Sequence, residues 1–280
     1  MQTSTSADRA PLLERALTTL VQVVLVVFLL GPVALAIVTA LQPAHVSLAG
    51  GTTLAFVPTL ENFAALFGEF DLGRPLLNSA VSSGAALIVA LVIGLPAAYA
   101  LSRVQVRGGT AITIALFAAR GLPAIGVAIP LFLIFTDIGL VDSVWALVIV
   151  YLPFNVALVV WLMQQYFTSI PVELDEAAAL DGAGRLRTLV TVILPISTPG
   201  LISTSIMTFM YGWNNFFYPL IFTHREAVTV PVALTQFLGD YTVNWGGLMA
   251  GVVMLSAPML IVGYLLRRYM VSGLTAGSVK

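Results

Sequence analysis

Long uncharged stretches separated by short polar segments dominate this chain. A membrane-spanning helix needs about 20 consecutive, mostly apolar residues. Six stretches meet this requirement, and we expect spans over residues 17–41, 76–101, 110–135, 144–167, 197–222 and 246–270. The pattern therefore predicts an all-α polytopic membrane protein with six transmembrane helices. Gly121, Pro123 and Pro130 should interrupt the third of them.

Basic residues decide the orientation of these spans, because arginine and lysine gather on the cytoplasmic side of a membrane. An even number of spans places both termini on one side. With the termini inside, nine basic residues are cytoplasmic and two are external, and Arg120 falls within the third span. The nine are Arg9, Arg15, Arg103, Arg107, Arg185, Arg187, Arg267, Arg268 and Lys280, and the two are Arg74 and Arg225. Both termini are therefore predicted to be cytoplasmic.

This topology predicts four regions along the chain. Residues 1–16 form a cytoplasmic N-terminal tail, and residues 17–75 form the first transmembrane helix with an external loop. Residues 76–270 form the core of the transmembrane domain, with spans two to six and a cytoplasmic segment over residues 170–195. Residues 271–280 form a cytoplasmic C-terminal tail.

The densest run of charge lies between spans four and five, over residues 173–187. Residues 143–172 before it and 188–224 after it contain no Asp, Glu, Lys or Arg. A charged segment between two such stretches must lie in water. It is therefore predicted to be a cytoplasmic element between two membrane spans.

This segment has the sequence features of two short helices. Pro171 suits a first helical turn, and the acidic residues that follow are favoured there by the helix dipole. Gly182 suits the C-terminal end of the first helix. A second helix is expected from Arg185 to Leu194 and should end at Pro195.

Composition agrees with a membrane protein and excludes several functions. The chain is 59% hydrophobic and 9% charged, whereas soluble domains carry about 25% charged residues. A net charge of −1 argues against binding to nucleic acid. The chain has no cysteine, and its two histidines lie far apart in predicted loops, so neither a metal centre nor a catalytic centre is expected. It also lacks the phosphate-binding loop motif, so this chain is not expected to use ATP itself.

The charged segment resembles the Glu-Ala-Ala loop of importer-type ABC transporter permeases. The family pattern has Ile at the position of Val192, which is the one departure. The segment from Ile170 to Ala183 is similar to the carbohydrate branch, the maltose-type permease subunits. The matching residues are Glu176-Ala177-Ala178, Gly182, Val192 and Leu194-Pro195, at the spacing of the family motif.

The resemblance implies a permease subunit of an ATP-driven importer in a prokaryotic cytoplasmic (inner) membrane. It would form half of the translocation pathway for a sugar or sugar-like solute, by alternating access. The implied partners are a second, non-identical permease subunit, two ATPase subunits, an external or periplasmic solute-binding protein and the lipid bilayer. No cofactor is expected on this chain, because ATP and Mg would act on the ATPase. The alternatives are a homodimeric permease, a polyol or glycerol phosphate as cargo, and an ATP-independent channel.

Two sets of residues are implied to contact the ATPase. The first set lies on the short helix, which in this family is a coupling helix that docks into a cleft of the ATPase. Since no basic residue stands three or four positions from Glu176, we expect its carboxylate to pair with the ATPase. The first set is Glu173, Glu176, Ala177, Ala178, Asp181 and Gly182, and the second, in the C-terminal tail, is Gly273, Leu274, Thr275 and Gly277.

Two further sets are candidates for the pathway and for the binding protein. Arg120, Asn214 and Asn215 are polar residues in predicted spans, where such residues either line a pathway or join helices. The external loop over residues 224–245 should face the solute-binding protein. Its candidate contact residues are Gln236, Asp240, Tyr241 and Asn244.

Overall fold

The computed structural model describes residues 12–48, 55–104, 108–239 and 242–275. In these ranges the secondary structure is helical, apart from an isolated β-bridge between Leu238 and Val243. The chain divides into two compact units. The first comprises Met1–Glu69 and Phe237–Val253, and the second comprises Phe70–Gln236 and Met254–Lys280.

The first unit contains a long apolar helix and two short ones. These are α1 (Leu12–Ala40), α2 (Ala44–Leu48) and α3 (Glu61–Gly68), joined by the first part of α14 (Trp245–Thr275). Asn62 of α3 ties the turn after α1 in place, because its Nδ2 donates to the carbonyl oxygens of Ala40 and Gln42 at 2.9 and 2.7 Å. Both Asn62 and Gln42 are buried.

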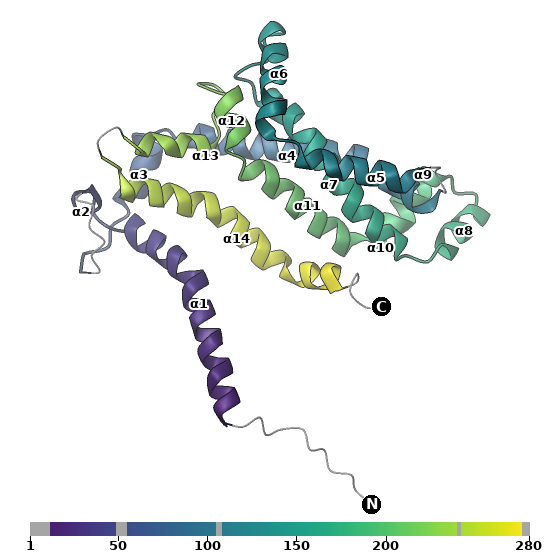
Figure 1. The fold of residues 1–280 in the computed structure, drawn as a ribbon, viewed down its shortest axis with the longest axis horizontal. Coiled ribbons are helices and arrows are strands. Elements are labelled where there is room, and N and C mark those ends of the chain that lie inside the picture. Colours follow the sequence, from purple (N-terminus) through teal and green to yellow (C-terminus); the bar gives the residue numbers. More distant parts are fainter. Residues whose placement is uncertain (1–11, 49–54, 105–107, 240–241, 276–280) are drawn as a thin grey trace, which may run out of the picture. The chain divides into compact units, whose positions relative to one another are not determined.

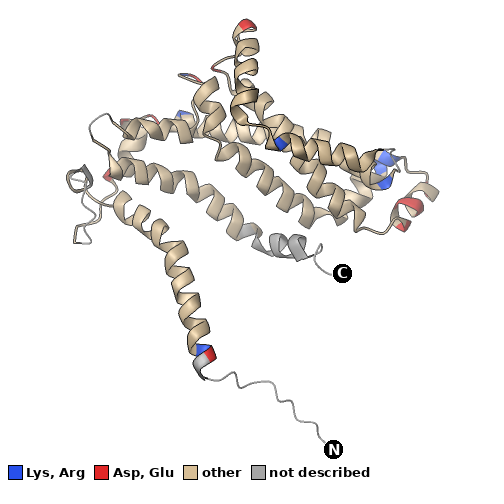
Figure 2. Cartoon of the chain, in the orientation of Figure 1, with Lys and Arg blue, Asp and Glu red and all other residues tan. Residues whose placement is uncertain are grey.

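Three helices form the core of the second unit, and they lie side by side in Figure 1. They are α4 (Gly73–Arg103), α7 (Val144–Thr168) and α11 (Thr198–Trp213). Apolar residues are buried where these helices meet, including the fully buried Tyr151 and Met163 of α7. Figure 2 shows that charged residues avoid the middle of these helices.

The third predicted span is broken at Gly121 and Pro123, as the sequence predicts, whereas Pro130 lies inside a helix. The chain forms α5 (Gly109–Ala118), a 3-10 turn (Ala119–Gly121) and α6 (Ala124–Asp137), with a bend of 86°. Pro123 explains the break, because it lacks an N–H and disfavours helical backbone at Leu122. Leu122 is accordingly extended, with φ −62° and ψ 136°.

The segment after α7 folds back in short pieces. α8 (Glu173–Leu180) is followed by α9 (Arg185–Thr188), a π turn (Leu189–Ile193) and α10 (Leu194–Ile196). The second helix thus continues to Ile196 rather than ending at Pro195, which lies in the first turn of α10. A bend of 89° separates it from the helix that begins at Thr198.

The fifth predicted span is interrupted near its end. α11 stops at Trp213, and α12 (Phe217–Phe222) begins after a short break. α13 (Val230–Ala233) and a 3-10 turn (Leu234–Phe237) then lead toward α14.

Four helices of the described residues are long and apolar enough to cross a membrane, and up to six spans result if each bent pair forms one span. The prediction of an all-α protein with several candidate membrane helices is confirmed. The number of spans and the position of the termini stay predictions.

Candidate functional site

The charged helix α8 has well-defined ends, as the sequence predicts. It begins where the carbonyl of Val172 accepts from the N–H groups of Asp175 and Glu176, at 2.9 and 3.2 Å. It ends at Gly182, whose φ of +79° lies in the left-handed region that favours glycine. The N–H of Ala183 donates to Ala178 O at 2.9 Å, and that of Gly182 donates to Ala179 O at 3.0 Å. This pair of bonds is the Schellman motif, and it confirms Gly182 as the stop of the helix.

The two faces of α8 differ sharply in exposure. Ala178 is turned toward the chain itself and is only 8% exposed, which leaves little surface for a partner. Asp175, one turn earlier, is partly buried on the same face. Leu180 on the opposite face is 89% exposed. The other residues expected to dock on an ATPase are exposed, namely Glu173, Glu176, Ala177, Asp181 and Gly182.

The carboxylate of Glu176 has no hydrogen bond or ion pair with any residue that the structure describes. This agrees with the sequence expectation that its carboxylate is free for an external partner. The neighbouring Asp175 behaves differently. It accepts from Arg103 Nε at 2.9 Å through Oδ2 and from the hydroxyl of Tyr99 through Oδ1.

Sequence reasoning missed this group of three residues. Arg103 had been counted only as a cytoplasmic basic residue, yet its side chain is 9% exposed and lies against the acidic helix. The sequence offered two separate signals. Arg103 is a basic residue at the end of a predicted span, and Asp175 is a carboxylate of the charged segment without an assigned role. Periodicity could not pair them, because they are 72 positions apart.

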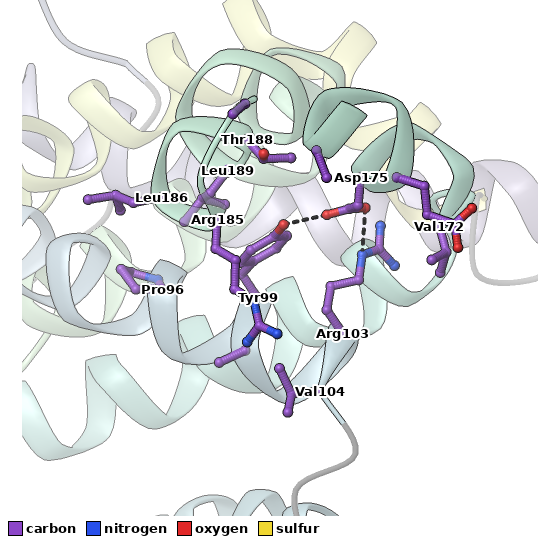
Figure 3. A pocket seen from close by; sticks show the side chains of 14 residues that line it. Pro96, Tyr99, Arg103, Val104, Val172, Asp175, Arg185, Leu186, Thr188 and Leu189 are labelled. Atoms are coloured by element: carbon purple, nitrogen blue, oxygen red, sulfur yellow. Dashed lines mark hydrogen bonds and ion pairs between the residues drawn. The ribbon is translucent and has the colours of Figure 1, made fainter. Parts of the chain in front are cut away.

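A pocket of about 450 Å³ lies beside this ion pair. Figure 3 shows Tyr99 and Arg103 projecting from α4 toward Asp175, with Arg185, Leu186 and Leu189 on the side of α9 and the π turn. The pocket therefore lies between the end of α4 and the charged segment. α4 contacts α8 through these polar side chains, and Tyr99 of α4 also shares a buried apolar cluster with Leu189 of the π turn.

The intramembrane candidates lie in the second unit, in two separate places. Arg120 occupies the 3-10 turn between α5 and α6, with its guanidinium carbon 5.5 Å from the centre of the Phe117 ring. It also lines a small pocket of about 100 Å³ with Pro153 and Phe154. Its position at a break in the helix explains how a charge is accommodated there.

The two amides differ from each other. Asn215 Oδ1 accepts from Tyr218 N at 3.1 Å, so its side chain caps the start of α12. Asn214 is exposed. The interpretation of Asn215 as a structural residue, one of the two left open by the sequence, is thus supported by this contact.

The remaining candidates are only partly described. Gln236 is exposed, whereas Asn244 caps α14, because its Oδ1 accepts from Gly247 N at 2.9 Å. Asp240, Tyr241 and Gly277 lie outside the described residues. Gly273, Leu274 and Thr275 belong to α14, which extends beyond the span expected to end at residue 270.

Comparison with known proteins identifies the family. Residues 90–275 match the model of the binding-protein-dependent transport system inner membrane component. The chain belongs to this family. The match covers α7, α8, α9 and α11 and thus includes the charged segment with the motif that suggested the resemblance.

Relatives of this permease agree with the assignment. It is 36% identical over 236 residues to the trehalose/maltose transport system permease protein MalG of Thermococcus litoralis, covering 82% of this chain and 84% of that protein. Its fold is similar to that of a bacterial ABC transporter involved in the import of the acidic polysaccharide alginate, with a TM-score of 0.78 and 20% identity over 95% of this chain and 100% of the other. A second alginate ABC transporter structure, in complex with an alginate pentasaccharide-bound periplasmic protein, has a TM-score of 0.65 and 15% identity, covering 91% and 92%. The prediction of an ABC importer permease is confirmed.

Proposed function

We propose that this permease forms half of the pathway of an ATP-driven carbohydrate importer and docks on an ATPase through α8. In this proposal the chain has six spans with both termini in the cytoplasm of a prokaryote. The nine-to-two distribution of basic residues supports that orientation. In this proposal α5 and α6 together form one span, and the bent segment from α9 to α12 forms another.

The observation that carries the proposal is the exposed face of α8. Leu180 is 89% exposed, and Leu186 after the glycine turn is 68% exposed. Both lie in a charged segment, where lipid cannot cover them. Apolar surface exposed to water is a feature of protein contacts when it forms a patch, and we propose that these two leucines belong to such a contact. Glu176 lies on the same short helix and supplies a carboxylate for a basic residue of the partner.

The cargo is proposed from the named relatives. The 36% identical protein is named for trehalose and maltose, and the structural neighbour imports an acidic polysaccharide. Both cargoes are carbohydrates. A periplasmic protein carries the sugar in the second neighbour, so we propose such a protein as the external partner here.

The remaining partners follow from the same proposal. Two ATPase subunits bind ATP and Mg and close on each other, and a second, non-identical permease completes the pathway. Closure moves α8, and the pathway then opens alternately to the two sides of the membrane. The exposed apolar surface of α1, with Phe28 75% exposed, is covered by lipid.

Co-expression with the candidate ATPase tests the proposal. We expect the permease to retain the ATPase through purification, and Glu176→Lys and Leu180→Asp each to lower the retained amount by about tenfold. Glu69→Lys is a matched control, because it reverses an exposed carboxylate in the predicted external region. Equal retention by all variants would show that α8 is not the docking element.

Uptake in proteoliposomes separates the importer from a channel. We expect labelled maltose or trehalose to enter only with the ATPase, ATP and the loaded binding protein. Uptake by the permease alone, down the gradient of the sugar, would contradict the proposal and favour the ATP-independent channel.

A further inference from the structure

We infer that Asp175, Arg103 and Tyr99 form a latch that carries the movement of α8 to α4, so that these three act as positioning residues in coupling. The inference rests on the proposed docking of α8 on an ATPase. It assigns to Asp175 a role distinct from that of Glu176, although the two are adjacent in sequence. Glu176 is exposed at the border of the pocket and its carboxylate has no partner among the described residues, whereas the carboxylate of Asp175 is bound to α4.

The geometry of the latch is specific. Arg103 is the last residue of α4, and Tyr99 lies one turn before it. The two side chains donate to different oxygens of the same carboxylate, Oδ2 and Oδ1 (Figure 3). Both oxygens of Asp175 are thereby held by one helix.

Burial makes the loss of one partner of this ion pair more costly than at the surface. The side chains of Arg103 and Asp175 are 9% and 16% exposed. Nη2 of Arg103 has no hydrogen-bond partner within the described residues, so the guanidinium depends on this carboxylate for its charge partner. Removing one member of a buried pair leaves the other charge without compensation.

The surrounding structure explains why α4 needs such a contact. The pocket of about 450 Å³ lies between the end of α4 and the segment of α8 and α9. At the edge of this pocket the two hydrogen bonds hold the carboxylate of α8 against the last turn of α4. α8 is also connected through α9 and α10 to α11, so movement of α8 would reach two core helices by separate routes.

Four variants test the latch in the complex with ATPase, second permease and binding protein. Asp175→Asn and Arg103→Gln each remove one charge. The exchange Arg103→Asp with Asp175→Arg restores an opposite pair. Glu69→Gln is the control, because it removes the charge of an exposed carboxylate in the predicted external region. The measurements are retained ATPase, ATP hydrolysis stimulated by loaded binding protein, and sugar uptake.

We expect both single variants to retain the ATPase and to lose about tenfold in sugar taken up per ATP hydrolysed. The exchange should recover part of this ratio, and Glu69→Gln should equal the wild type. Wild-type ratios of uptake to ATP hydrolysis in both single variants would overturn the latch. Loss of assembly that the exchange does not restore would also overturn it, because the residues would then serve folding only. Failure of the wild-type chain to retain the ATPase would instead overturn the proposed function.

Discussion

Gly94 of α4 lies directly against Val159 of α7, since a Cβ atom at Gly94 would be 2.6 Å from Val159 Cγ1. Both residues are buried, and they lie where the two helices share the core of the second unit. We expect Gly94→Ala to destabilise the permease by about 1–3 kcal/mol, because an added methyl group has no space there. Thermal unfolding in detergent measures this change.

Two further variants serve as controls for Gly94→Ala. Adding Val159→Ala to Gly94→Ala removes Cγ1, the nearest atom, but leaves Val159 Cβ at 2.9 Å, so it should recover part of the lost stability. Gly84→Ala lies in the same helix, where a Cβ would meet nothing within 4 Å, and should not lower the unfolding temperature, because alanine favours the helix. Equal effects at both glycines would contradict the packing argument.

Helix positions in this permease could be predicted because the apolar stretches are long and their ends carry clear signals. The span expected over residues 144–167 is α7 (Val144–Thr168), and the glycine turn at Gly182 is found as predicted. Length and hydropathy suffice for such elements, since a membrane helix satisfies its backbone hydrogen bonds internally.

Two features could not be predicted in this way. The 86° bend at Pro123 depends on where the chain packs after the break, because proline permits a kink as well as a turn. The contact of Asp175 with Arg103 joins two segments that no local pattern relates.

Asn244 was expected to face a binding protein, although asparagine before a helix also signals an N-cap, which the structure shows.

Asp142 holds the loop after α12 by accepting four backbone N–H groups, from residues 224–227, at 2.9–3.2 Å. Burial raises the pKa of this carboxyl, but the four hydrogen bonds outweigh it and lower the pKa from 3.8 to about 2. We expect Asp142→Asn to cost about 1–3 kcal/mol near neutral pH, because the backbone donors lose a charged acceptor. Asparagine also tolerates the positive φ of 60° at this position, so the backbone is not strained. Its NH2 group replaces the oxygen that accepts from Glu226 N, so the variant removes one hydrogen bond together with the charge.

The pH dependence follows from the lowered pKa of Asp142. A carboxylate with a depressed pKa stabilises the folded state above its ordinary pKa, and this stabilisation is lost as the pH falls through the folded value. The difference in unfolding temperature between wild type and Asp142→Asn should therefore be constant above about pH 4 and shrink toward about pH 2. A difference that is independent of pH in this window would show that the charge contributes nothing.

Gly182 should be sensitive to any side chain, because its φ is +79°. Gly182→Ala is expected to weaken the turn after α8 by about 1–2 kcal/mol and to lower uptake, and Gly182→Asn should be milder. Gly184→Ala is the matched control, with a φ of −71° and no atom within 4 Å of an added Cβ. Uptake assays in cells, normalised to the amount of permease in the membrane, compare the three. If Gly184→Ala proved as harmful as Gly182→Ala, strain at the left-handed position would not be the cause.

Labelling of single cysteines decides the orientation in the membrane, because the natural chain contains none. Arg225→Cys places a thiol at an exposed position after α12, and Leu180→Cys places one on α8, where the leucine is 89% exposed. The distribution of basic residues predicts the first site outside and the second in the cytoplasm. An impermeant maleimide should then label Arg225→Cys in intact cells, but Leu180→Cys only after the membrane is permeabilised. Labelling of both sites in intact cells would place α8 and the end of α12 on one side, so that the bent segment from α9 to α12 could not cross the membrane and no ATPase could reach α8.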